Sequence, residues 1–470
     1  MRFQLSIIVL VQVCTLVLLS CNPSPELDRP PNIIVIFADD MGYGDIGVFG
    51  HPTIKTPHLD KMANEGQKWT SFYVAASVCT PSRAGLMTGR LPIRNGMCSS
   101  NRRVLFPDSE GGIPENEITI AEALKKVNYQ TACIGKWHLG HLPQYLPTNN
   151  GFDYYFGIPY SNDMDRVQLE GLTGREVNTN PKVEYFNVPL MQNEQIIERP
   201  ADQTTITKRY TDETIKFITE NKDKPFFIYL AHNLPHIPLF RSVEFEGKSK
   251  RGIYGDVIEE IDSGIGRIFT SLRENGLEEN TLVVFTTDNG PWLVYNSHGG
   301  SAGLLRDGKG STFEGGMRVP TIFSWKGNIK PAVVNDMGST LDLFPTICKL
   351  TGADYPHDRV MDGYDLSETL LNEVESPRKS MVYYWGEEIY AYRSGAYKAH
   401  FKTRERVYIN REVETHETPL LYNLEVDPSE KYDISETNTE IIAGILNEVE
   451  KHRASVDSVE NQLMKTKRLE

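Results

Sequence analysis

The sequence is poor in several features that mark common protein classes. It has only six cysteines in 470 residues, which excludes a fold held together by a framework of disulfides. No low-complexity block interrupts the chain, and its hydrophobic share of 39% is ordinary for a folded domain, so extended disorder is not expected. Beyond its N-terminus no apolar run is long enough to cross a bilayer, which excludes a protein with several membrane spans.

Positive charge is also scarce. The chain has 49 Lys and Arg residues against 63 Asp and Glu residues, which gives a formal net charge of −14 at pH 7. An acidic protein of this kind is unsuited to nucleic acid, so we expect no nucleic-acid partner. It can act on a small anion only if a locally basic cleft attracts that anion.

The one long apolar run lies at the N-terminus and predicts a targeting segment. Arg2 provides a positive start, residues 5–19 are mostly apolar, and the run ends in a Leu-Leu-Ser-Cys tetrapeptide at Cys21. This tetrapeptide resembles the lipobox of bacterial lipoproteins, in which a peptidase cleaves before the cysteine and the thiol becomes lipidated. An ordinary signal peptide and a transmembrane helix are the alternatives. The short run and the Pro-rich segment after it favour a processed signal.

This interpretation divides the start of the chain into a signal peptide, residues 1–20, and a tether, residues 21–30. The mature protein is then exported and anchored to a membrane by lipid at Cys21, in the periplasm or at the cell surface. Three cysteines without an evident role remain in the folded part, Cys98, Cys133 and Cys348. Because their number is odd, at most one bridge can form among them, and three buried free thiols are the alternative.

Two apolar segments rich in β-branched residues, 32–38 and 281–287, predict buried parallel strands. The first is followed by Asp39 and Asp40, and the second by Asp288 and Asn289. Ligand sites in open α/β sheets lie at the carboxyl ends of such strands. Adjacent carboxylates repel each other, and a cation bound between them is the simplest compensation. Oxygen ligands suit a hard cation such as Ca²⁺, while a polar turn after each strand is the plainer alternative.

The remaining pattern predicts an α/β fold followed by a smaller unit. Amphipathic segments alternate with strands up to about residue 365, and shorter strands and one helix follow. We therefore predict a larger α/β domain over residues 31–365 and a C-terminal α+β subdomain over residues 366–470. The polar segment 165–205 shows no regular element and is expected to be a loop that lines a binding site. The basic tail, 465–468, is expected to be frayed. The expected helices are 59–66, 118–127, 210–220, 257–272, 341–350 and 439–452, and the further strands are 131–134, 225–231, 381–385 and 397–402.

One stretch, Cys79-Thr80-Pro81-Ser82-Arg83 with Thr88-Gly89-Arg90 after it, is unusually specific. It resembles the signature of the type I sulfatases, Cys-x-Pro-Ser-Arg followed by Thr-Gly-Arg. In that family a formylglycine-generating enzyme oxidises the cysteine to an aldehyde, 3-oxoalanine, whose hydrate is the nucleophile. The simpler interpretation is a small buried cysteine beside a Pro turn. The full length of the match favours the first interpretation.

Four further segments support the resemblance. Gly135–Gly140 contains Lys136 and His138, Gly308–Pro320 contains Lys309, and Leu420–Glu430 matches the C-terminal subdomain of the family. Gly157–Asp163 is similar to the branch that contains arylsulfatase A and N-acetylgalactosamine-6-sulfatase. His232 and His236 precede prolines. They also suggest a zinc site, but no cysteine or third histidine lies nearby at the spacing of zinc ligands.

The resemblance implies an alkaline-phosphatase-like fold, with a mixed, mostly parallel sheet flanked by helices and a smaller antiparallel sheet. It also implies a full set of site residues. One Ca²⁺ is held by Asp39, Asp40, the modified Cys79, Asp288 and Asn289. Catalysis uses Cys79, Arg83, Lys136, His138, His236 and Lys309, and Ser161 and His232 bind substrate.

The resemblance further implies a two-step reaction. The hydrate at position 79 attacks sulfur while Ca²⁺ and Arg83 hold the sulfate oxygens. Lys309 and His236 help the alcohol to leave, and the second hydroxyl of the hydrate then loses its proton, relayed through His138. The bond to sulfate breaks and the aldehyde returns, so release is built into this covalent mechanism.

Two other functions remain open at this stage. A phosphate or phosphonate ester hydrolase of the same superfamily is the first, although a two-metal phosphatase would need more metal ligands. A non-catalytic glycan-binding lipoprotein is the second, and it predicts the loss of a cysteine or metal ligand that this chain retains. For an exported protein, sulfated polysaccharides or their oligosaccharides are the expected substrates, and the motifs do not specify the sugar.

Overall fold

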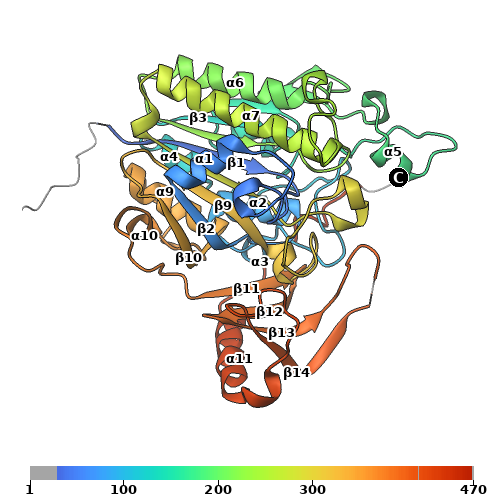
Figure 1. Ribbon diagram of the computed structural model, residues 1–470, viewed down its shortest axis with the longest axis vertical. Coiled ribbons are helices and arrows are strands. Elements are labelled where there is room, and N and C mark those ends of the chain that lie inside the picture. Colours follow the sequence, from blue (N-terminus) through green and yellow to red (C-terminus); the bar gives the residue numbers. More distant parts are fainter. Residues whose placement is uncertain (1–28, 411, 468–470) are drawn as a thin grey trace, which may run out of the picture.

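A computed structural model describes residues 29–410 and 412–467 of the chain (Figure 1). The predicted signal peptide, Cys21 and most of the predicted tether lie outside the described residues. Within the described part, no helix has the length and apolar character that crossing a membrane requires.

A sheet of ten strands forms the centre of the larger unit, and β1 (Asn32–Ala38) lies in its interior. It pairs in parallel with β7 (Phe226–Ala231) and β8 (Thr281–Thr287), as the apolar runs predicted. The order across the sheet is β10-β2-β9-β8-β1-β7-β3-β4-β5-β6. The other strands are β2 (Gln67–Tyr73), β3 (Gln130–Gly135), β4 (Tyr154–Gly157), β5 (Leu190–Gln192), β6 (Gln195–Glu198), β9 (Arg318–Ser324) and β10 (Ala332–Ser339).

Helices cover both faces of this sheet, which is why β1 is apolar at every position. Ile33, Val35 and Phe37 belong to one buried cluster, and Ile34 and Ile36 belong to the other. Each face needs its own helical layer because neighbouring side chains of a strand point in opposite directions. Helices α1 (Pro57–Glu65), α6 (Ile206–Glu220) and α7 (Ile253–Glu274) pack on one face, and α2 (Cys79–Thr88), α4 (Ile120–Lys125) and α9 (Leu343–Thr351) pack on the other.

The segment 165–205 is more regular than its sequence indicated. It contains the short helix α5 (Gly174–Thr179) and the β5–β6 hairpin, which extends the edge of the large sheet. These strands have only three and four residues, and β6 is mostly exposed, so no apolar alternation marked them. The other short helices are α3 (Pro92–Asn95), α8 (Glu314–Met317) and α10 (Ser367–Asn372).

A second sheet of four antiparallel strands forms the smaller unit at the bottom of Figure 1. It consists of β11 (Ser380–Trp385), β12 (Glu388–Ser394), β13 (Tyr397–Thr403) and β14 (Glu414–Asn423), with α11 (Thr439–Ala454) packed against it. The mixed sheet flanked by helices and the separate antiparallel sheet confirm the predicted fold class.

The C-terminal tail is paired with the larger unit rather than frayed. The carbonyl of Lys465 accepts a hydrogen bond from the Glu110 amide at 2.8 Å, and the Lys467 amide donates to the Asp108 carbonyl at 3.1 Å. The prediction of a frayed tail was therefore wrong as far as Lys467. Backbone pairing with a distant loop leaves no mark in the local sequence.

Candidate active site

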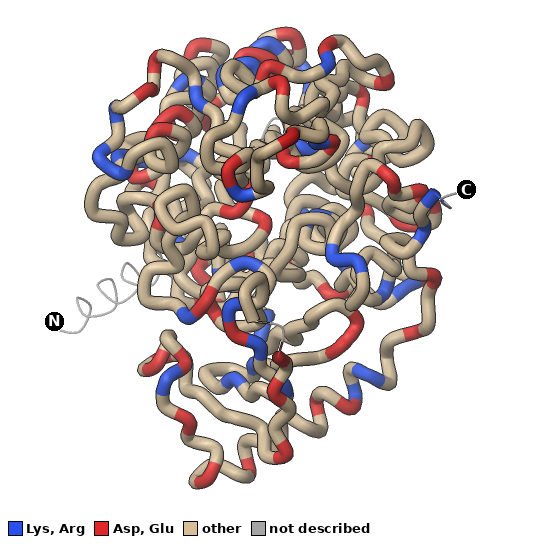
Figure 2. Tube along the Cα trace, turned by 90° about the vertical axis from the view of Figure 1, so that its right-hand side faces the viewer, with Lys and Arg blue, Asp and Glu red and all other residues tan. Residues whose placement is uncertain are grey.

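The candidate site lies where β1, β3, β7 and β8 reach their carboxyl ends, on the side of the molecule that faces the viewer in Figure 2. Asp39 and Asp40 follow β1, Lys136 follows β3, and Asp288 follows β8. Because these strands are parallel neighbours, residues far apart in sequence meet at one edge of the sheet. The fold therefore brings together the two acidic strand ends singled out in the sequence.

Cys79 is the first residue of α2 and is almost fully buried. Its Sγ lies 3.6 Å from Oδ1 of Asp39. Burial raises the pKa of the Cys79 thiol far above its usual value, although Lys136 and Lys309 oppose the shift. An unmodified cysteine in this place remains a neutral thiol and is a poor nucleophile, since the thiolate is the reactive form.

Three buried carboxylates surround Cys79. The ligand atoms of Asp39, Asp40, Cys79 and His236 all lie within 4.8 Å of one another. Oδ1 of Asp288 accepts a hydrogen bond from the Asp40 amide at 3.1 Å. Burial, and next the negative charge of Asp39, raise the pKa of Asp288 to about 7. So much negative charge out of water is costly without further compensation.

One amide oxygen beside these carboxylates has no hydrogen-bond partner among the described residues. Asn289 donates through Nδ2 to Oδ1 of Asp40 at 2.7 Å, while its own Oδ1 is buried and has no hydrogen-bond partner among the described residues. An orphaned amide oxygen next to crowded carboxylates is the donor set that a hard divalent cation prefers. The residues at this position therefore fit a Ca²⁺ ion, with Asp39, Asp40, Asp288 and Asn289 as its oxygen ligands.

Three cationic side chains are paired with these carboxylates. Arg83 donates from Nη2 to Oδ2 of Asp288 at 2.9 Å and from Nη1 to the carbonyl of Lys136 at 3.0 Å. Lys136 Nζ lies 2.6 Å from Oδ2 of Asp39, and Lys309 Nζ lies 2.8 Å from Oδ2 of Asp40. Burial alone would lower the pKa of Lys309, but Asp40 and other anionic neighbours raise it well above its usual value, so the ammonium stays charged.

The ring of His138 has a defined tautomer. Its Nε2 lies 2.9 Å from the carbonyl of Leu105, which can only accept, so Nε2 carries the proton. Nδ1 is buried without a partner among the described residues and keeps a free lone pair. Burial, and next Lys136, lower the pKa of His138, which keeps the ring neutral.

The structure brings most of the other predicted residues to the same place. Ser161 accepts a hydrogen bond from Lys136 Nζ at 3.2 Å. His236 lies between Asp40, with its Nε2 3.6 Å from Oδ2, and its own chain, where Nδ1 is 2.5 Å from the Ile237 carbonyl. His232 is buried against the ring of Tyr210, and burial lowers its pKa to about 4. Ser161 and His236 thus adjoin the charged groups, while the ring contact of His232 is with Tyr210.

Sequence reasoning missed two aromatic residues of this site, Trp292 and Tyr408. The Lys309 ammonium lies 4.2 Å from the centre of the Trp292 ring, and the His236 ring lies 5.3 Å from it. Tyr408 comes from the segment between β13 and β14 and packs against Trp292. Trp292 follows Asp288 and Asn289 closely and could have been found by that proximity. Tyr408 is distant in sequence from every motif, and no local signal marks it.

The other cysteines form no bridge in the described part of the chain. Cys98, Cys133 and Cys348 are all buried free thiols, which is one of the two expected alternatives. Burial raises the pKa of Cys98 and of Cys348 to about 12, so these thiols are inert.

Comparison with known proteins agrees with this geometry. Residues 31–353 match the family model described as Sulfatase, and residues 376–470 match the model described as C-terminal region of aryl-sulfatase. The chain is 42% identical over 429 residues to arylsulfatase A of Homo sapiens, an alignment that covers 86% of this chain and 83% of the human protein. It is 40% identical over 436 residues to N-acetylgalactosamine-6-sulfatase of Mus musculus, an alignment that covers 87% of this chain and 82% of the mouse protein. The structure of Ps i-CgsB in complex with k-i-k-neocarrahexaose is similar with a TM-score of 0.78 and 31% identity, over 94% of this chain and 96% of that one.

Proposed function

The chain belongs to the sulfatase family and is a sulfuric ester hydrolase, and from this premise we propose that it removes sulfate from sulfated glycans by means of an oxidised Cys79 and one Ca²⁺ ion. The observation that carries the proposal is the convergence of Cys79 with three buried carboxylates and three buried cations. A sulfate monoester is an anion, and a cleft with these fixed positive groups attracts it to an acidic protein.

Conversion of Cys79 to 3-oxoalanine by a formylglycine-generating enzyme is part of the proposal. The raised pKa of the buried Cys79 thiol argues against a thiolate nucleophile. When converted, residue 79 supplies a hydrated aldehyde oxygen as the nucleophile. Its position at the N-terminus of α2 adds the partial positive charge of the helix end where the anion binds.

The ion would be held by Asp39, Asp40, Asp288, Asn289 and the oxidised residue 79. When bound, Ca²⁺ supplies positive charge that offsets the buried carboxylates and attracts the oxygens of the sulfate group. The orphaned Oδ1 of Asn289 supports this assignment because it has no other partner among the described residues.

The side chains around this centre have separable roles. Arg83 fixes the Asp288 carboxylate. Lys136 donates hydrogen bonds both to the Asp39 carboxylate and to the Ser161 hydroxyl. Lys309 carries a permanent charge beside Asp40 and is suited to stabilise the oxygen of the departing alcohol. His138 is suited to accept a proton at Nδ1, the one ring nitrogen left free. His236 is neutral because burial lowers its pKa, so it contributes hydrogen bonding rather than charge.

Glycan substrates are proposed from the named relatives. One similar structure is a complex with a neocarrahexaose, and one relative is named as a sulfatase of N-acetylgalactosamine 6-sulfate. Export and lipid anchoring at Cys21 remain part of the proposal because they give access to external polysaccharides. Phosphate and phosphonate ester hydrolysis is the competing activity, and the sulfatase relatives at about two-fifths identity argue against it.

The test measures the modification of residue 79 and the hydrolytic activity of the protein. The chain is co-expressed with a formylglycine-generating enzyme, and the mass of the peptide that contains residue 79 is measured, with aldehyde or hydrate expected in place of thiol. We expect sulfate release from 4-nitrophenyl sulfate to exceed phosphate release from 4-nitrophenyl phosphate, and Cys79→Ala to abolish it. Cys98→Ala is the matched control and keeps activity. Turnover by Cys79→Ala at the wild-type rate would refute the proposal.

A further inference from the structure

An aromatic pair borders the charged centre. Trp292 follows β8, and Tyr408 lies in the segment that joins β13 to β14. Their ring centres are 5.0 Å apart, and the planes are inclined at 54°. Figure 1 shows this connection extending away from the small sheet toward the larger unit. Through Trp292, which contacts both Lys309 and His236, the pair adjoins the proposed leaving-group side of the site.

Tyr408 is held in place by the segments that carry the chemistry. It packs on Gly310, where an added Cβ would lie 3.1 Å from the ring, and Gly310 has a φ of +83° that other residues rarely adopt. The Gly310 amide donates to the carbonyl of Ser77 at 2.8 Å, two residues before Cys79. The Tyr408 hydroxyl has no hydrogen-bond partner among the described residues, although the ring is half-buried. A ring held in this way, with its hydroxyl unpaired, can offer a ligand both an apolar face and a hydrogen bond.

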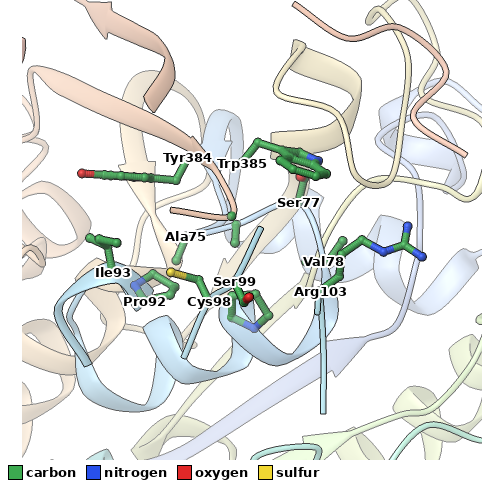
Figure 3. A pocket seen from close by; sticks show the side chains of 13 residues that line it. Ala75, Ser77, Val78, Pro92, Ile93, Cys98, Ser99, Arg103, Tyr384 and Trp385 are labelled. Carbon is green, nitrogen blue, oxygen red and sulfur yellow. The ribbon is translucent and has the colours of Figure 1, made fainter. Parts of the chain in front are cut away.

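Arg103 adds a positive charge beside this ring. Its guanidinium carbon lies 4.5 Å from the centre of the Tyr408 ring, and the side chain is exposed. Figure 3 shows the guanidinium pointing away from the small cavity that Cys98 and Val78 line. Within residues 29–410 and 412–467, no ion pair involves Arg103, whereas its neighbour Arg102 is paired with Asp108. An uncommitted guanidinium on an acidic protein can bind an anion through two parallel hydrogen bonds.

We propose that Trp292, Tyr408 and Arg103 form a leaving-group subsite that selects sugars with a further anionic substituent besides the scissile sulfate. The aromatic pair offers an apolar face to the sugar ring, the Tyr408 hydroxyl contacts a ring substituent, and Arg103 binds the second sulfate or carboxylate. This inference rests on the proposed function and deepens it. It also gives the segment between β13 and β14 a role in substrate selection.

The test measures binding and sulfate release separately. Sulfated tetrasaccharides of ι-carrageenan, chondroitin 6-sulfate and heparin are titrated into the wild-type protein by calorimetry at fixed ionic strength, with a desulfated tetrasaccharide as a further probe. We expect at least one sulfated probe to bind. We expect Tyr408→Ala and Arg103→Gln each to weaken its binding about tenfold, since a buried aromatic contact or a charged hydrogen bond has this effect. Arg102→Gln is the matched control and changes binding less than twofold.

The possible results distinguish failure of the subsite from failure of the proposed function. If no sulfated probe binds, or if Tyr408→Ala and Arg103→Gln bind as the wild type does, the subsite is refuted. If Tyr408→Phe retains full affinity, the hydroxyl contact is refuted and the ring contact stands. Release of sulfate from 4-nitrophenyl sulfate tests the proposed function on its own, because this small ester has no second anionic group. Hydrolysis without selective binding overturns only the subsite, and the absence of hydrolysis overturns the proposed function.

Discussion

At the scale of single residues, the centre of the site has the ligands that the proposed cation requires. Asp39, Asp40 and Asp288 are buried together, and two of the cations beside them, Arg83 and Lys136, also bond to other partners. Asn289 directs an amide oxygen that no described residue satisfies into a buried environment. On the proposed assignment, a bound divalent ion satisfies this oxygen and offsets the carboxylates, which links its binding to the stability of the fold.

Calcium is therefore expected to stabilise the protein, and chelation to destabilise it. At a free Ca²⁺ concentration about 100 times its dissociation constant, the gain is about 2.7 kcal/mol. We expect Asn289→Leu to lower this gain, measured as the rise of Tm on adding Ca²⁺ after chelation. Asn32→Leu, at the opposite end of β1, is the control and retains the full rise. An equal response of both variants to Ca²⁺ would remove Asn289 from the ligand set.

Among the elements, α2 has the strictest packing requirement because it carries Cys79 at its first position. All ten of its residues are buried, including Arg83. Gly85 permits this close approach, since an added Cβ would lie 2.3 Å from the Cβ of Ala75. The helix cannot move away from Ala75 without moving residue 79 relative to β1.

A pair of glycine substitutions tests this constraint. Gly85→Ala is expected to destabilise the protein by about 1–3 kcal/mol through overpacking and to lower kcat, because residue 79 shifts with the helix. Gly444→Ala, in the exposed part of α11, meets nothing within 4 Å and is expected to stabilise by about 0.5–1 kcal/mol. Denaturant unfolding gives the stability of each variant, and sulfate release gives its kcat. A neutral Gly85→Ala would show that α2 is free to adjust.

At the scale of the whole molecule, a buried polar network joins the two sheets. Glu314 of α8 lies 3.0 Å from Lys398 of β13, and the Tyr73 hydroxyl donates to it at 2.6 Å. Lys398 also lies 3.0 Å from Glu430, which accepts from the Glu314 amide at 2.7 Å. Burial would raise the pKa of Glu314, but Lys398 and two arginines outweigh it and lower the pKa to about 2.

This shift predicts how acid affects the joint between the sheets. Because the native pKa of Glu314 is lowered, the unfolded chain binds more protons, so the stabilisation is present above about pH 4.5 and is lost as the pH falls toward 2. The stabilisation lost on protonation of Glu314 is about 3 kcal/mol. Glu314→Gln should lower the free energy of unfolding at pH 7 and reduce its loss between pH 4.5 and 2. Tm profiles against pH for both proteins measure this, and parallel profiles would contradict it.

The sequence by itself determined the class of fold and most of the candidate site. Continuous apolar runs rich in β-branched residues, such as 32–38 and 281–287, favour buried central strands, and the polar groups at their ends meet because parallel strands share an edge. The cysteine segment and the motifs around Lys136 and Lys309 are local in sequence, so they were recognisable without coordinates.

Only the tertiary structure decided which distant groups contact them. The tautomer of His138 depends on the Leu105 carbonyl, and the aromatic pair depends on Tyr408, which comes from the segment between β13 and β14. The β5–β6 hairpin and the paired tail up to Lys467 are formed by backbone hydrogen bonds, which any side chain permits. Contacts of this kind have no sequence period, because they arise from how separate segments meet in the folded chain and not from the order of residues along any one of them.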